Sequence, residues 1–133
     1  MRIIAALIAL FCIAAPARAE VASASPSMVV IQVEGDVAAS PAETWRRLLR
    51  IERWWSSAHT YSGDARRLSL DPRAGGCWCE RWGGGQSVQH GQVLLVQPGR
   101  VIRLQANLGP LQELAVSGVL TIVTSAQDEI GRA

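Results

Sequence analysis

Polar and apolar residues alternate along residues 28–39, near the start of the chain. Val29, Ile31, Val33 and Val37 fall at alternate positions, and the polar residues Gln32, Glu34 and Asp36 fall between them. A period of two places these side chains on one face of an extended chain and the polar ones on the other, which predicts a half-buried strand. Residues 20–27 before it are small and polar, so we expect a linker there.

A helical period replaces this alternation at residues 40–50. Ser40 is suited to cap a helix, Pro41 to occupy its first position, and Glu43 to complete a capping box. An apolar stripe at helical spacing follows, made of Trp45, Leu48 and Leu49. The spacing predicts one helix here, with Trp45 in the core, and a second short helix over residues 51–57.

Five further strands are predicted along the rest of the chain, each bounded by a turn sequence. They cover residues 66–70, 77–82, 87–96, 101–108 and 114–124, with glycine- or proline-bearing turns between them. One strand, two helices and then five strands in a meander is the order of an α+β protein. We expect an antiparallel sheet that packs against the helical segments.

Residues 1–19 have the order of a secretory signal peptide. Arg2 gives a positive start, residues 3–15 are an apolar run, and a small-x-small cleavage site ends at Ala19. The run is shorter than the roughly 20 residues that a membrane span needs. We therefore predict cleavage between Ala19 and Glu20, secretion (to the periplasm in a Gram-negative source) and no stable membrane anchor afterwards. The alternative is an amphipathic or buried first helix.

Charge excludes one class of partner. The whole chain has 13 basic and 11 acidic residues, a formal net charge of +2. Arg2 and Arg18 would be removed with the signal peptide, so the mature part would be formally neutral. Without a basic surplus we expect no binding to nucleic acid.

Cys77 and Cys79 allow three interpretations. As zinc ligands with His90 they would need a fourth partner such as His59, and Cys-x-Cys is not the usual Cys-x2-Cys spacing. A disulfide would be awkward, because residues two apart in a regular strand are separated by roughly 6.5–7 Å. The third interpretation is two small residues packed under a sheet. We expect no metal and no cofactor, and a disulfide only if the strand is kinked.

Glu80 and His90 are the candidates for acid–base chemistry. They would lie on neighbouring strands of one hairpin, so that their side chains could meet. The spacing identifies no nucleophile, so the catalytic residues stay unassigned. The alternative is a polar pair at the rim of a cavity or on the solvent side of the sheet.

Tryptophan dominates the aromatic residues, with five Trp against one Tyr and one Phe. Large flat rings with an N–H group suit pockets that hold apolar ligands, although they also suit an ordinary core. The predicted ligand-binding residues are Trp55, His59, Tyr61, Trp78 and Trp82. Because His59 and Tyr61 follow the second predicted helix, we expect them at the mouth of the pocket.

Several short motifs occur in a fixed order along residues 29–123. They are Pro41 at the start of a helix, Trp45 in its first turns, Trp54 or Trp55 in the next helix, Arg73 with Gly75 and Gly76 before a strand, and Gly91, Val93 and Pro98 along a strand and its turn. In this order they resemble the SRPBCC (START-like, polyketide cyclase) superfamily. The similarity is greatest to its branch homologous to the chaperone-ATPase activator.

The resemblance implies a helix-grip fold, in which a curved antiparallel sheet with two short N-terminal helices wraps around a long C-terminal helix. A hydrophobic cavity lies between them, and members bind lipids, polyketides, hormones or other apolar molecules. Some members catalyse cyclisation or ring hydroxylation. One more strand and the long helix would be expected where this sequence reaches Ala133. The resemblance therefore implies a domain over residues 28–133 that is truncated at its C-terminus.

We predict an exported protein that binds a small hydrophobic or amphipathic ligand between the sheet and the helices. One alternative is a cyclase- or hydrolase-like enzyme of the same fold that uses Glu80, His90 or His59. The other is a truncated domain without independent activity, completed by a homodimer or by a partner that donates a helix.

Overall fold

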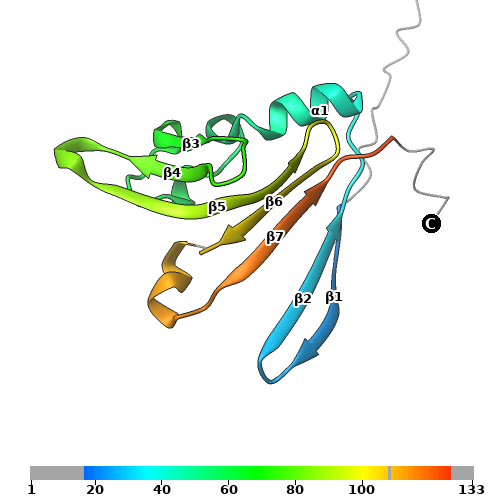
Figure 1. Cartoon of the computed structure of the whole chain (residues 1–133), viewed down its shortest axis with the longest axis horizontal. Helices are drawn as coiled ribbons and strands as arrows, with labels where there is room; N and C mark the ends of the chain where they lie inside the picture. Colours follow the sequence, from blue (N-terminus) through cyan, green and yellow to red (C-terminus); the bar gives the residue numbers. More distant parts are fainter. Residues whose placement is uncertain (1–16, 108, 127–133) are drawn as a thin grey trace, which may run out of the picture. The chain divides into compact units, whose positions relative to one another are not determined.

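The computed structural model describes residues 17–107 and 109–126 of the chain (Figure 1). Contacts within the chain define two compact units, one that ends at Ala38 and one that begins at Ala39. Each unit has a sheet of its own. Most of the predicted signal peptide, residues 1–16, lies outside the described residues.

The first unit is an antiparallel hairpin of β1 (Arg18–Ser25) and β2 (Met28–Glu34). The strand predicted from the alternating pattern is confirmed over β2. The linker predicted at residues 20–27 is wrong, because most of it forms β1, and the predicted cleavage site also lies in this strand. Small polar residues are extended here because β2 supplies partners for their backbone groups. Every residue of both strands is exposed, so the hairpin alone lacks the buried face that the alternation predicts.

The second unit begins with α1 (Pro41–Leu48), where the capping sequence predicts a helix. The Oγ atom of Ser40 accepts a hydrogen bond from the backbone N–H of Glu43 at 3.2 Å, which satisfies one free donor of the first turn. The Glu43 carboxylate does not complete the capping box and accepts instead from Arg47 Nε at 2.7 Å. Trp45 is buried, as predicted.

Three short 3₁₀ turns follow α1. They are η1 (Ile51–Arg53), η2 (Ser57–His59) and η3 (Ala65–Arg67). The second helix predicted at residues 51–57 is therefore wrong. The backbone leaves helical geometry at Trp54 (φ −129°, ψ −14°), and Ser56 Oγ accepts a hydrogen bond from Ala58 N at 3.3 Å. A serine side chain that bonds to nearby backbone in this way competes with a continuous helix.

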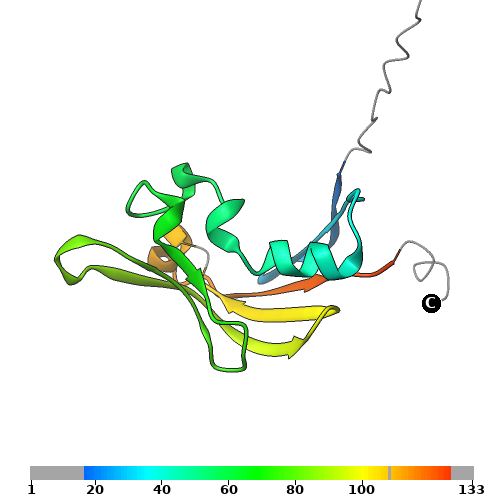
Figure 2. The ribbon, with the colours of Figure 1, turned by 90° about the horizontal axis from the view of Figure 1, so that it is seen from above.

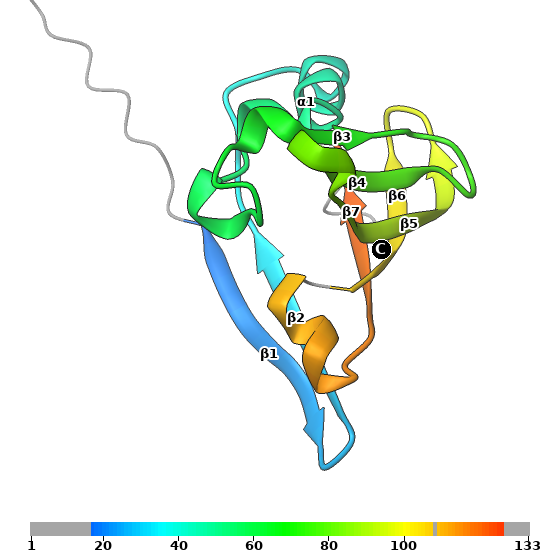
Figure 3. The ribbon, with the colours of Figure 1, turned by 90° about the vertical axis from the view of Figure 1, so that its left-hand side faces the viewer.

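A five-stranded antiparallel sheet forms the rest of the second unit, and strands adjacent in sequence are adjacent in the sheet. The strands are β3 (Leu68–Leu70), β4 (Cys77–Arg81), β5 (Ser87–Gln97), β6 (Val101–Ala106) and β7 (Gly118–Val123). All five predicted strands and the α+β class are confirmed. The last strand begins later than predicted, because Gly109–Leu114 forms the 3₁₀ turn η5, coloured orange in Figures 1 and 3.

Strand β5 is irregular at two positions. Its pairing with β4 skips His90, and its pairing with β6 skips Leu94. An extra unpaired residue of this kind bends a strand and redirects its side chains. His90 is thereby buried, whereas Leu94 is 46% exposed.

The core lies where the helical segments pack on the sheet. In Figure 2 the segments from α1 to η3 lie on one side of the five strands. The buried core residues are Trp45, Ile51, Ala65, Leu68, Trp78, Val93, Ile102 and Leu104. Strand β7 adds only partly buried residues, Leu120 and Ile122. Burial is thus concentrated on the middle of the sheet, around β4, β5 and β6.

Candidate functional site

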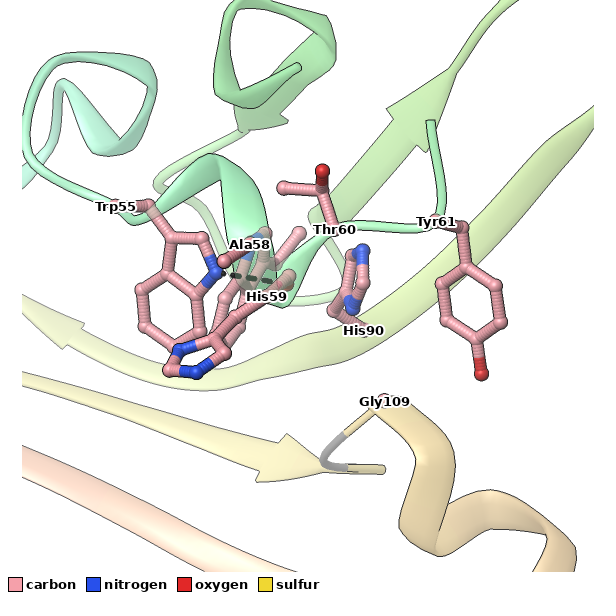
Figure 4. Close-up of a pocket in the computed structure, with 8 residues that line it drawn as sticks. Trp55, Ala58, His59, Thr60, Tyr61, His90 and Gly109 are labelled. Atoms are coloured by element: carbon pink, nitrogen blue, oxygen red, sulfur yellow. Dashed lines mark hydrogen bonds between the residues drawn. The ribbon is translucent and has the colours of Figure 1, made fainter. Parts of the chain in front are cut away.

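A pocket of about 310 Å³ lies beside the core of the second unit (Figure 4). It is lined by Trp55, Ala58, His59, Thr60, Tyr61, Trp78, His90 and Gly109. Five of these residues come from the irregular segment between η1 and η3, and the others come from β4, β5 and the start of η5. Its volume is at the lower end of the range for small-molecule sites, roughly 300–1,000 Å³.

Aromatic rings form a continuous row along this pocket. The ring centroids of Trp55 and Trp78 are 4.9 Å apart in an edge-to-face arrangement, and those of Trp78 and His90 are 5.5 Å apart. Tyr61 extends the row beyond His90 at 6.0 Å, and Trp54 extends it beyond Trp55 at 5.6 Å. Contacts of this kind hold each ring in place through its neighbours, so the pocket presents a largely preformed aromatic wall.

Trp55 and Trp78 are fixed by different means. The indole N–H of Trp55 donates to the backbone oxygen of His59 at 3.0 Å, which ties the ring to its own loop. Trp78 lies opposite Gly91 across the β4–β5 pair, and a side chain at Gly91 would begin 3.5 Å from the Trp78 ring. That distance is an ordinary van der Waals contact, whereas the same side chain would begin only 2.9 Å from the backbone oxygen of Gln105, so the glycine permits close approach of β6. Trp78 Nε1 is fully buried and has no hydrogen-bond partner among the described residues.

Glu80 is a buried carboxylate behind the pocket, with 0% of its surface exposed. Its Oε1 accepts a hydrogen bond from the backbone N–H of Ser62 at 2.6 Å, and its Oε2 accepts from that of Tyr61 at 3.0 Å. His90 Nε2 lies 2.9 Å from the same Oε2. Burial raises the pKa of Glu80, but the hydrogen bonds from Ser62, Tyr61 and His90 outweigh it, so the pKa lies below its ordinary value. Glu80 is therefore ionised at neutral pH.

The Glu80 carboxylate has two structural consequences. It pins the backbone of residues 61–62, and with it the loop that carries Thr60 and Tyr61, to strand β4. It also orients His90, because an ionised carboxylate accepts hydrogen bonds and the neutral imidazole must then carry its proton on Nε2. Nδ1 is left as the acceptor. The contact predicted between Glu80 and His90 is confirmed.

His90 reaches the pocket because of the irregularity in β5. It is the residue that the β4–β5 pairing skips, it is 4% exposed, and its ring forms part of the pocket wall (Figure 4). Among residues 17–107 and 109–126, Nδ1 has no hydrogen-bond partner. Unlike Trp78 Nε1, it is not one of the fully buried polar atoms without a partner. We therefore place Nδ1 where a molecule in the pocket can reach it.

Cys77 and Cys79 form a disulfide. Their Cα atoms are 5.3 Å apart, closer than the spacing of a regular strand, and the β4–β5 register shifts next to Cys79. The kinked strand that a disulfide requires is thus present, and the interpretation of two unlinked small residues is wrong. Disulfide sulfurs are not thiolate ligands, which also removes the zinc interpretation. The described residues contain no group of three or more His, Cys, Asp or Glu that could hold a metal ion.

The structure brings together four of the five predicted ligand-binding residues, namely Trp55, His59, Tyr61 and Trp78. The fifth, Trp82, is half-buried just before the glycine turn η4 (Gly83–Gly85) and does not line the pocket. The pocket includes Trp78 but does not extend to the end of β4, which precedes Trp82.

Three lining residues have no sequence signal that could have identified them. Ala58 and Thr60 are small residues of a segment whose path depends on the break after η1. Gly109 was predicted only as a chain break between two strands. It reaches the pocket because the turn η5 begins there.

Within the part of the chain that the structure describes, no helix has the length and apolar character to cross a membrane. Comparisons with protein-family models, with curated proteins and with solved structures find no match to this chain.

Proposed function

We propose that this protein binds a small hydrophobic or amphipathic molecule in the pocket between β4, β5 and the segment of residues 55–61. The observation that carries the proposal is the pocket of about 310 Å³ with its row of aromatic rings. Aromatic walls with a few polar atoms are typical of sites that hold small apolar ligands. A ligand that buried roughly 200 Å² of apolar surface would gain about 5 kcal/mol before the cost of association.

The fold class is consistent with the resemblance noted in the sequence. An antiparallel meander with helical segments on one side supports an SRPBCC-like, helix-grip domain, and we extend the proposal to that fold. The disulfide between Cys77 and Cys79 supports export, because such bonds persist in oxidising compartments. Together these features fit an exported protein that carries a ligand. In a Gram-negative source it would be periplasmic.

A second candidate function, catalysis by a general base, has one specific observation in its favour. A histidine oriented by a buried carboxylate at 2.9 Å is an arrangement that can take a proton from a bound molecule. Binding remains the first proposal, because the pocket wall offers no identified nucleophile. If a substrate is found, replacing His90 by Gln should abolish turnover more than it weakens binding.

The test of ligand binding fills the pocket without disturbing the core. Ala58 is exposed and lines the pocket, so Ala58→Leu should occupy part of its volume. Ala74, exposed in the turn between β3 and β4 and outside the pocket lining, provides the matched control Ala74→Leu. Equilibrium dialysis with naphthalene should show binding to the wild type and to Ala74→Leu, and about tenfold weaker binding to Ala58→Leu. Equal affinity for all three proteins would place the ligand elsewhere and contradict the proposal.

A further inference from the structure

The pocket wall contains a polar atom whose hydrogen-bonding capacity is unused among the described residues, the acceptor Nδ1 of His90. The donor Nε1 of the neighbouring Trp78 also has no partner there, but it is fully buried. The remaining two indoles near the pocket are satisfied, since Trp54 donates to Leu48 O and Trp55 to His59 O, each at 3.0 Å. The accessible atom without a partner is therefore on His90, whose ring centroid lies 5.5 Å from that of Trp78.

An acceptor on a ring as buried as that of His90 has little access to water. A buried donor or acceptor without a partner loses the free energy of its hydrogen bonds to water, so such groups are rare in folded proteins. Trp78 is 3% exposed and His90 is 4% exposed. A bound molecule that donates a hydrogen bond to Nδ1 of His90 would recover this free energy, whereas a purely apolar molecule would not.

We infer that the pocket selects a planar aromatic ligand that carries a hydroxyl group, an inference that rests on the proposed ligand-binding function. The hydroxyl hydrogen is donated to Nδ1 of His90, the polar ring atom that is not fully buried. A hydroxyl is the smallest group that both donates and accepts. The flat body of the ligand lies against the rings of Trp55 and Tyr61, which flank Trp78 and His90 in the aromatic row.

Glu80 determines whether His90 presents a hydrogen-bond acceptor or a donor to the ligand. Because its ionised carboxylate accepts the hydrogen bond from Nε2, the His90 ring in its neutral form offers an acceptor and not a donor to the pocket. A ligand with an ether or a carbonyl in place of the hydroxyl has no hydrogen to donate to Nδ1. We therefore expect discrimination against these acceptor-only analogues, although they have nearly the same shape.

The experiment compares 2-naphthol, 2-methoxynaphthalene and naphthalene in equilibrium dialysis at neutral pH. Apolar burial alone favours naphthalene, because the hydroxyl of naphthol loses hydrogen bonds to water on binding. We expect the opposite order, with 2-naphthol bound about tenfold more tightly than naphthalene or the methoxy compound, the size of one good hydrogen bond. In His90→Phe this preference should be lost, whereas Trp82→Phe, outside the pocket, should keep it.

The outcomes separate this inference from the function on which it rests. Naphthalene bound as tightly as 2-naphthol, or more tightly, would overturn the hydroxyl selection and leave ligand binding intact. No binding of any of the three compounds would overturn both. Since His90→Phe removes a partner of Glu80 and could impair folding, nitrogen NMR of the wild-type histidines gives an independent test. Addition of 2-naphthol should shift Nδ1 of His90 toward the position of a hydrogen-bonded acceptor, and an unchanged signal at saturating ligand would contradict the proposal.

Discussion

The hairpins β1–β2 and β4–β5 have a similar construction but opposite burial. Both are antiparallel pairs with one irregularity in register. The first exposes all of its residues, whereas the second buries Trp78, Glu80 and His90. The difference lies in what covers each hairpin within its own unit. The loop after η2 donates two backbone hydrogen bonds to Glu80, and no such segment covers β1–β2 among residues 17–38, the described part of the first unit.

The comparison shows that alternation specifies an extended backbone but not a site. A strand contributes to a site where another segment satisfies its polar groups and covers its apolar ones. Matched substitutions in the two hairpins can test this difference directly, and the expected effects differ by several kcal/mol.

The largest difference is expected for apolar truncation. Trp78→Ala should lower the free energy of unfolding by about 3–5 kcal/mol, because the indole is 3% exposed and its removal leaves a cavity in the core. Val33→Ala in β2 should change it by no more than about 0.5 kcal/mol, because Val33 is 66% exposed. Urea denaturation monitored by circular dichroism measures both. A loss of under 1 kcal/mol for Trp78→Ala would mean that the β4–β5 hairpin is no more buried than the first.

A carboxylate in each hairpin gives the second comparison. Both oxygens of Glu80 accept backbone N–H groups, so the NH₂ group of a glutamine would face a donor in either orientation. Glu80→Gln should therefore cost about 2–3 kcal/mol of stability. Glu34 on β2 accepts only from the side chain of Gln32 among the described residues and is exposed, so Glu34→Gln should cost at most a few tenths of a kcal/mol. Equal costs in urea denaturation would show that the Glu80 hydrogen bonds contribute no more than an exposed pair.

The pH dependence of the free energy of unfolding gives a further test of the comparison between Glu80 and Glu34. Because the folded pKa of Glu80 lies below its ordinary value of 4.5, the unfolded chain takes up this proton first as the pH falls. The stabilisation from Glu80 is therefore complete above pH 4.5 and is lost as the pH falls through the folded pKa. The stability difference between the wild type and Glu80→Gln should shrink in that range, whereas the difference between the wild type and Glu34→Gln should stay near zero. A constant difference for Glu80→Gln would argue against a lowered pKa.

Much of the fold could be predicted from the sequence, because local signals and the final structure agree there. Ser40 and Pro41 begin α1, and the alternating stretches form strands. The second helix was mispredicted, since apolar spacing around Trp54 and Trp55 did not reveal that Ser56 would compete for the backbone. The linker at residues 20–27 was mispredicted because composition carries no information about a pairing partner.

The site was predictable in its residue types but not in its geometry. The predicted hairpin placed Glu80 and His90 on neighbouring strands, where their side chains do meet. Two features of the site depend on tertiary contacts that no local sequence pattern indicates. One is the irregularity in β5 that turns His90 toward the pocket, and the other is the position of Gly109 in the pocket lining. For the same reason the sequence did not reveal that Trp82 would lie outside the lining of this pocket.

The smallest expected effect concerns the crosslink within β4. The Cys77–Cys79 disulfide closes a very short loop, so its removal should raise the entropy of the unfolded chain little and cost about 1–2 kcal/mol. The double variant Cys77→Ser/Cys79→Ser tests this in urea denaturation, with dithiothreitol-treated wild type as the matched reduced state. Because Trp78 lies between the two cysteines, near-ultraviolet circular dichroism should also change, and 2-naphthol affinity should fall by no more than a few-fold. A loss of all tertiary signal on reduction would mean that the crosslink, and not packing by the loop, separates the β4–β5 hairpin from β1–β2.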